Sequence, residues 1–198
     1  MRLYQAVLII VTGIIIASIA AYVLYGGGGS TGRGIAAIGG PFTLTDQNGK
    51  ARTEQDLKGS YSLVYFGYTF CPDVCPTALH VISNAMGRLE KEIQEKITPV
   101  FITIDPERDN IEQLKSYVGN FHPRIIGLTG TELQIAEAAR AYRVYYAKSK
   151  DNGSTTDYLM DHSSIVFLMN PKGVYITHFT HTTEPERMAA TLRREIGG

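Results

Sequence analysis

Two cysteines, Cys71 and Cys75, are the residues of this sequence best suited to chemistry. They are the only cysteines among 198 residues, and they lie in the stretch "FGYTFCPDVCPTALH". A thiolate is both a nucleophile and a soft metal ligand, so a pair this close can form a redox couple or bind one ion. The alternatives are two unpaired buried thiols or a structural disulfide. A disulfide that closes so small a loop stabilises little.

The local sequence places this pair where a buried strand meets a helix. The apolar run Ser62–Phe70 predicts a strand buried on both faces, and the apolar spacing from Val74 to Ile93 predicts a helix. Cys71 is then expected in the loop and Cys75 in the first helical turn, where the positive end of the helix dipole lowers a thiol pKa. Residues four apart share a helix face, so both sulfurs can reach one ion or each other.

Strands and helices alternate along the rest of the chain. A hairpin is expected around Asn48-Gly49, and further strands and helices are expected over 97–105, 106–121, 124–130, 131–146, 163–180 and 184–196. This order predicts an α/β domain with a mixed central sheet. A cysteine pair at the end of its first buried strand is typical of a thioredoxin-like fold.

The number of soft ligands limits which metal fits. Zinc sites and iron–sulfur clusters usually need four such ligands, and the chain has only two cysteines. Copper(I) accepts two thiolates and one imidazole. The five candidate imidazoles are His80, His122, His162, His178 and His181. His162 is the predicted ligand because it precedes the strand Ser163–Met169, whose entering loop packs beside the cysteines in a thioredoxin-like fold. Met160 is either a further sulfur ligand or a core residue.

The first 40 residues differ in composition from the rest. Ala6–Leu24 carries no charge and is long enough to span a bilayer, so residues 1–25 are predicted to be a membrane anchor and 26–40 a glycine-rich linker. A cleaved signal peptide is the alternative. Arg2 predicts a cytoplasmic N-terminus, which puts the domain 41–198 on the periplasmic side of an inner membrane, where disulfides persist. The net charge of zero gives no basis for nucleic-acid binding.

Four stretches resemble the Sco family of membrane-anchored copper chaperones, which have a thioredoxin fold. They are "DLKGSYSLVYFGYTFCPDVCPTAL", "ITIDPERDN", "YRVYY" and "DYLMDHSSIVFLMNPKG". The resemblance implies that Cys71, Cys75 and His162 bind Cu(I) or Cu(II). It also implies a role in maturing the CuA centre of cytochrome c oxidase subunit II, with other copper chaperones or thioredoxin-like reductants as further partners. It further implies that an extra hairpin over 142–157 brings the His162 loop over the cysteines.

Several features leave alternatives open. Asp73 either biases the metal site or caps the helix. Asp105, Arg108 and Asp109 form either a docking surface or, as we favour, a local ion-pair network. Cys71 and Cys75 could also act as the redox pair of a thiol–disulfide oxidoreductase or a redox sensor, although no cis-proline is evident and the spacer is wider than in general thioredoxins. A peroxidase is disfavoured, because Tyr68 stands where such enzymes have Thr.

Overall fold

The computed structural model describes residues 2–21, 37–150 and 158–197. The chain divides into two compact units, Met1–Ala36 and Ala37–Gly198. The described part of the first unit is helix α1 (Arg2–Ala21). Within the described ranges, no helix is both long and apolar enough to cross a membrane. The anchor over 1–25 stays a prediction.

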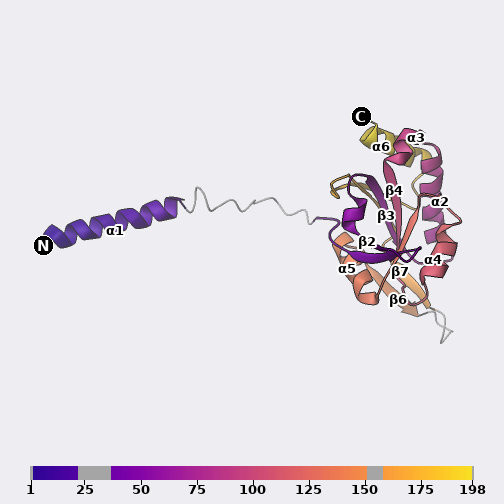
Figure 1. Cartoon of the computed structure of the whole chain (residues 1–198), viewed down its shortest axis with the longest axis horizontal. Coiled ribbons are helices and arrows are strands. Elements are labelled where there is room, and N and C mark those ends of the chain that lie inside the picture. The colour runs from indigo at the N-terminus through magenta and orange to yellow at the C-terminus, as the bar shows by residue number, and fades with distance from the viewer. Residues whose placement is uncertain (1, 22–36, 151–157, 198) are drawn as a thin grey trace. The chain divides into compact units, whose positions relative to one another are not determined.

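The second unit is built on a mixed sheet of seven strands, in the order β2-β1-β5-β4-β3-β8-β9 (Figure 1). The strands are β1 (Thr43–Asp46), β2 (Ala51–Thr53), β3 (Tyr61–Gly67), β4 (Ile97–Thr103), β5 (Ile126–Thr129), β8 (Ile165–Met169) and β9 (Tyr175–Thr180). Strands β3, β4 and β5 are parallel, and the other neighbours pair antiparallel. The predicted α/β class and mixed sheet are confirmed.

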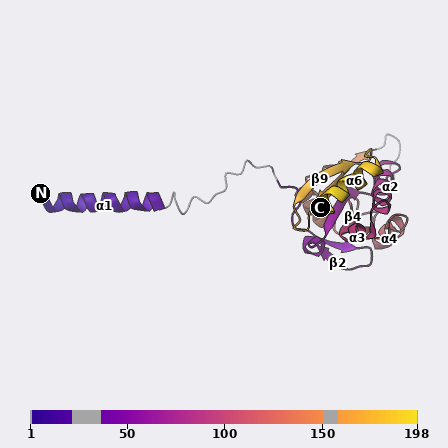
Figure 2. The same ribbon diagram turned by 90° about the horizontal axis from the view of Figure 1, so that it is seen from above.

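Helices cover both faces of this sheet. They are α2 (Val74–Gly87), α3 (Lys91–Glu95), α4 (Ile111–Val118), α5 (Glu132–Tyr142) and α6 (Pro185–Ile196), with a short 3₁₀ helix η2 (Glu54–Leu57). Successive strand residues point to opposite faces. Phe66 of β3 meets Tyr142 of α5 with ring centroids 5.4 Å apart, whereas Phe101 of β4, a neighbour of Tyr65, meets Tyr117 of α4 at 5.5 Å. Figures 1 and 2 show α2 on the same side of the central sheet as α4.

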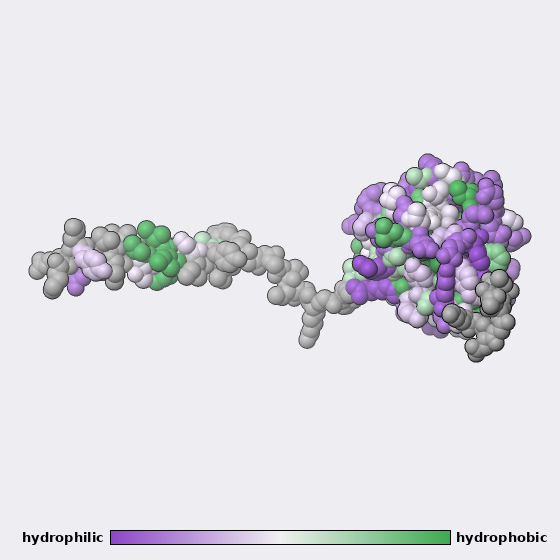
Figure 3. Space-filling view, turned by 90° about the horizontal axis from the view of Figure 1, so that it is seen from below, coloured by the Kyte–Doolittle hydropathy of each residue, from purple (hydrophilic) through white to green (hydrophobic). Residues whose placement is uncertain are grey.

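A separate two-stranded sheet lies outside the central one. It is the hairpin of β6 (Tyr146–Lys150) and β7 (Tyr158–His162), whose strands pair only with each other. The polar turn between them, residues 151–157, lies outside the described residues. An extra hairpin is present, but it lies further along the chain than the predicted 142–157: β6 begins at Tyr146, and β7, which ends at His162 itself, follows residue 157. On the face of the domain drawn in Figure 3, hydrophilic side chains predominate, as expected of an exposed surface.

Three helices are shorter than the sequence predicts, and the one predicted over 131–146 ends at Tyr142, where Arg143 takes a left-handed backbone. The helix predicted over Val74–Ile93 ends at Gly87, because Arg88 and Leu89 donate to carbonyls three residues back and Leu89 turns into the core. The helix predicted over 106–121 begins only at Ile111, where the side chain of Asn110 caps it. The residues before it instead form a turn whose carboxylates bind neighbouring segments. By contrast, Thr131 caps α5 as predicted.

Candidate metal centre

The cysteine half of the site is built from one strand–helix junction. Cys71 lies in the loop after β3 and is half-buried, whereas Cys75 is the second residue of α2 and is fully buried. The backbone N–H of Cys75 donates to the Cys71 sulfur over 3.4 Å. Both predicted placements are confirmed. The amide therefore directs positive charge at the Cys71 sulfur, as expected at a helix N-terminus.

Gly67, the last residue of β3, makes room for the buried thiol. A Cβ placed there would lie 2.9 Å from the Cys75 sulfur and 2.9 Å from the Phe101 ring. Real Cβ atoms do not approach other atoms so closely, so a side chain at this position would displace one of them. The strand thus ends in the one residue type that lets the sulfur pack directly against its backbone.

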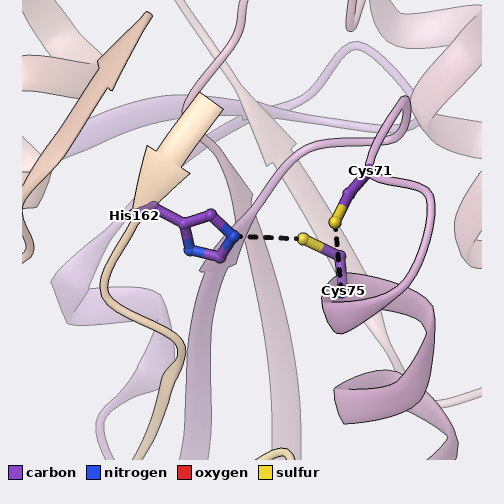
Figure 4. A group of neighbouring side chains, drawn as sticks. All are labelled: Cys71, Cys75 and His162. Atoms are coloured by element: carbon purple, nitrogen blue, oxygen red, sulfur yellow. Dashed lines mark hydrogen bonds between the residues drawn. The ribbon is translucent and has the colours of Figure 1, made fainter. Parts of the chain in front are cut away.

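The histidine half comes from the β6–β7 hairpin, far along the chain. His162 is the last residue of β7, and its Nε2 lies 3.4 Å from the Cys75 sulfur (Figure 4). The other ring nitrogen, Nδ1, lies 3.3 Å from the Ser163 carbonyl oxygen. Tyr65 and Tyr68 present their rings edge-on to the imidazole at 6.2 and 6.0 Å. The ring is thereby held with one nitrogen toward the sulfurs.

The three side chains form one compact group. The sulfurs of Cys71 and Cys75 and a ring nitrogen of His162 all lie within 4.8 Å of one another. Two thiolates and an imidazole are ligands that suit Cu(I), and they are too few for a closed zinc or iron–sulfur site. The donor set therefore fits a copper ion. Met160 is buried in the hydrophobic core.

The two thiols differ in acidity. A hydrogen bond from the Cys75 thiol, together with those from His162 and the backbone, holds the pKa of Cys71 far below its ordinary value. The same bond to Cys71, reinforced by burial, raises the pKa of Cys75. Burial also raises the pKa values of Tyr65 and Tyr68, so both phenols stay protonated. The lowered pKa favours the thiolate at Cys71 over the thiolate at Cys75.

The other four histidines lie elsewhere. His80 is exposed and packs edge-on against Phe121, the His122 backbone N–H donates to Ser83, and His178 bonds to the Tyr175 hydroxyl. His181 has a buried Nδ1 without a hydrogen-bond partner. Among the described residues, the group that could hold a metal contains none of the four. There is also no cis peptide bond in the described ranges, as the lack of a proline before Ser163 predicts.

The acidic residues near the site have structural partners. Asp73 precedes α2, but its carboxylate bonds no backbone amide there and instead accepts from the Thr77 hydroxyl at 3.4 Å, so the predicted helix cap is absent. Asp105 pairs with Arg108, and the buried Asp109 accepts from Thr69. The predicted local ion-pair network is therefore present for Asp105 and Arg108, whereas the partners of Asp109 are uncharged threonine groups.

Sequence reasoning missed Gly67 and Tyr158. The hydroxyl of Tyr158 donates to Asp105, and its ring lies under the Arg108 guanidinium. A glycine within a buried apolar run, four residues before a cysteine, was a usable signal for Gly67. The partners of Tyr158 lie about fifty positions away, and no local pattern indicates such a contact.

The fold and the geometry of the site can be compared with known proteins. The SCO1/SenC family model matches residues 30–197, most of the chain. The chain belongs to the SCO1/SenC family. Its fold is thioredoxin-like. It is 44% identical to Bradyrhizobium japonicum ScoI, solved with copper bound, over 80% of this chain and 99% of that one, with a TM-score of 0.74. Arabidopsis thaliana ScoI, also solved with copper bound, is 40% identical over 81% and 99%, with a TM-score of 0.74.

Curated members of the SCO1/SenC family are longer than this chain. It is 41% identical to the Arabidopsis thaliana protein SCO1 homolog 1, mitochondrial, over 82% of this chain and 48% of that protein. It is 43% identical to the human protein SCO2 homolog, mitochondrial, over 81% of this chain and 61% of that protein. The chain thus aligns with about half to three-fifths of these two relatives.

Proposed function

We propose that this chain is a copper-binding protein of cytochrome c oxidase assembly, with copper held by Cys71, Cys75 and His162. The observation that carries the proposal is the grouping of two sulfurs and one imidazole nitrogen within 4.8 Å. This donor set suits Cu(I), and the related ScoI proteins of Bradyrhizobium and Arabidopsis were solved with copper bound. Copper is a cargo to be passed on, so the chain acts as a metallochaperone.

Each ligand has a distinct part in this function. Cys71 is half-buried, so it is the sulfur that an incoming or outgoing partner can reach. Cys75 is fully buried between α2 and the end of β3, so it binds the copper ion from the interior side of the site. The Ser163 carbonyl beside Nδ1 of His162 orients the ring so that Nε2 faces the sulfurs, where it can bind a metal once it has lost its proton.

The recipient that we propose is the CuA centre of cytochrome c oxidase subunit II, with other copper chaperones or thioredoxin-like reductants as further partners. We also propose that residues 1–25 anchor the chain in an inner membrane, with the domain on the periplasmic side. The uncharged run Ala6–Leu24 and Arg2 before it support this topology. Membership of the SCO1/SenC family supports the oxidase partner.

The acidity difference between the thiols favours a second candidate function, reduction of a disulfide in the partner. The Cys71 thiolate would attack that disulfide, releasing one partner thiolate and forming a mixed disulfide. Cys75, on losing its proton, would then attack the Cys71 sulfur and release the second partner thiolate. The partner gains two electrons, and the Cys71–Cys75 pair is left oxidised. An oxidised pair has no thiolates for Cu(I), so the two functions exclude each other at any one moment.

The test of the copper site is the amount of Cu(I) bound by the full chain in detergent. We expect about one ion per chain, and we expect Cys71→Ser and Cys75→Ser to abolish tight binding because soft thiolates supply most of the affinity. His162→Ala should weaken it by at least the roughly 10-fold that loss of an outer-shell partner costs, because a ligand itself is removed. Unchanged binding in His162→Ala would overturn the three-ligand site. His178→Ala is the matched control.

A second experiment separates delivery from reduction. Copper-loaded and copper-free full chain are each mixed with a copper-free CuA domain whose cysteines form a disulfide. The same mixtures are repeated with a CuA domain that another reagent has already reduced, and thiols and copper in the domain are measured. Delivery predicts that copper appears only in the domain that was reduced beforehand. Reduction predicts that the copper-free chain produces two thiols per domain. Neither product would refute both functions for this recipient.

A further inference from the structure

The turn Asp105–Asp109, between β4 and α4, lies between the two halves of the candidate site. Toward the cysteines, the buried carboxylate of Asp109 accepts the backbone N–H of Thr69 at 2.9 Å and its hydroxyl at 2.6 Å. The Thr103 hydroxyl donates to the same carboxylate at 2.6 Å. Because Thr69 is two residues before Cys71, these bonds fix the turn to the cysteine loop.

The same turn holds the β6–β7 hairpin on its other side. Asp105 accepts the Tyr158 hydroxyl at 2.7 Å, and Nη1 of Arg108 donates to the Tyr158 carbonyl oxygen at 3.0 Å. Glu107 pairs with Lys148 of β6 at 2.6 Å. The hairpin pairs with no strand of the central sheet, so its position depends on the short link to β8, on the packing of Met160 in the core and on side-chain contacts such as these. We call Asp105, Glu107, Arg108 and Asp109 the clasp.

Arg108 is the member of the clasp that touches both halves. Its guanidinium carbon lies 3.8 Å from the ring centre of Tyr158 in the hairpin and 4.9 Å from that of Phe70, the residue before Cys71. Its Nε bonds to Asp105, whereas its buried Nη2 has no hydrogen-bond partner. A guanidinium close to two aromatic rings gains cation–π energy from each of them, which an aliphatic side chain cannot replace.

We propose that Arg108 is a positioning residue, which holds the β6–β7 hairpin against the cysteine loop so that His162 reaches the thiols. The inference rests on the proposed copper function for its purpose, but its geometry is independent of metal. His162 and Tyr158 are the two ends of the same strand β7, and the hairpin supplies the third ligand from there. Loosening the Tyr158 end therefore moves His162, while Cys71 and Cys75 stay on the central sheet and α2.

The test is a double-mutant cycle on the full chain in detergent, with Cu(I) affinity measured by competition with a chromophoric chelator. We expect Arg108→Leu to weaken Cu(I) binding by about tenfold, the effect typical of residues that orient a ligand. In the His162→Ala background the same substitution should change it by less than about twofold, because the ligand that Arg108 positions is gone. An equal effect in both backgrounds would overturn the proposal, since Arg108 would then act without His162.

A metal-free measurement keeps this inference separate from the copper function. Amide hydrogen exchange over Tyr158–His162 should quicken by about tenfold in Arg108→Leu, while exchange in β3 stays unchanged. Arg124→Leu is the matched control, since this half-buried arginine also donates to backbone carbonyls, those of Glu95 and Ile97, but lies away from the hairpin. If the hairpin amides do not respond, the clasp is refuted whatever copper does. If they respond but the wild-type chain binds no Cu(I), only the copper function fails.

Discussion

The two halves of the candidate site are positioned by different kinds of contact. Cys71 and Cys75 come from one loop and one helix start, joined directly to a central strand of the sheet. His162 comes 87 residues after Cys75, on a hairpin that pairs with no strand of that sheet. The cysteine half is therefore positioned by backbone hydrogen bonds and core packing. The histidine half is joined to β8 by Ser163 and Ser164 and depends in addition on side chains of the clasp, so single substitutions in the clasp can loosen it.

The largest effect that we expect concerns the reactivity of the two thiols. In the metal-free full chain, iodoacetamide should alkylate Cys71 faster than Cys75 by on the order of 100-fold at about pH 6, because the pKa of Cys71 is lowered and that of Cys75 is raised. A lowered pKa keeps the thiolate populated as the pH falls, so the Cys71 rate should drop only once the pH passes through that low value.

Peptide mapping by mass spectrometry measures both rates, and unfolded chain is the control in which the two cysteines should react alike. Equal rates in the folded chain would contradict the asymmetry of the pair. His162→Ala should slow Cys71 at low pH, since a hydrogen bond from His162 contributes to its acidity. The change in rate thus measures how strongly the histidine half affects the acidity of Cys71 in the cysteine half.

A second prediction tests the packing of the cysteine half. Gly67→Ala should lower the free energy of unfolding by about 1–3 kcal/mol, because the new Cβ meets the Cys75 sulfur and Phe101. Displacement of the sulfur should also weaken Cu(I) binding. Chemical denaturation and chelator competition measure the two effects.

Gly127→Ala in β5 is the matched control. A Cβ at Gly127 would come 2.8 Å from the Leu114 side chain, away from the thiols. We expect a similar loss of stability there with copper affinity unchanged. If Gly67→Ala affected stability alone, the contact with the sulfur would have no bearing on the site.

A third prediction concerns the β1–β2 hairpin, which is stabilised by hydrogen bonds among its own residues. In β1–β2 the carboxylate of Asp46 accepts the backbone N–H groups of Asn48 and Lys50 and the Nε of Arg52 at 2.9–3.0 Å. Burial alone would raise the pKa of Asp46, but these hydrogen bonds outweigh it and lower the pKa. Asp46→Asn should therefore cost about 1–2 kcal/mol of stability at neutral pH.

The sign of the pH dependence follows from that lowered pKa. The stabilisation from Asp46 is complete above the ordinary carboxyl pKa and is lost as the pH falls through the lower folded value. Thermal melts of wild type and Asp46→Asn should converge in acid, and a constant difference would contradict this account. Copper affinity should not change, in contrast to a substitution in the clasp.

The smallest expected effect has the opposite sign. Arg143, at the end of α5 just before the β6–β7 hairpin, has a left-handed backbone with φ of 57°. Glycine adopts this conformation without strain but loses more entropy on folding, so Arg143→Gly should raise stability by only about 0.5 kcal/mol. Arg140→Gly, within α5, should lower stability instead. A loss of stability in Arg143→Gly would show that its side chain, which donates to the Ala37 carbonyl, matters more than the backbone.

The difference between local and long-range contacts also explains what the sequence could predict. The strand before Cys71, the helix start at Cys75 and the cap at Thr131 each follow from residues within one turn of each other, and all were predicted. The breaks at Gly87 and before Ile111 were not, because they depend on where Leu89 packs and on what Asp109 binds. His162 was found only by assuming a fold. Tyr158 was missed, since its contacts with the clasp cross about fifty residues.

The span between Cys75 and His162 also bears on how the molecule reaches its native state. Joining them closes a loop of 87 residues, and such closures come at a higher entropy cost than the local contacts of β3 and α2. A chain emerging from the ribosome presents its paired thiols well before the imidazole exists. During that interval the thiols have neither the His162 imidazole nor the strand β8 that later borders β3. The burial that Cys75 has in the folded domain is thus acquired only after the thiols themselves have been made.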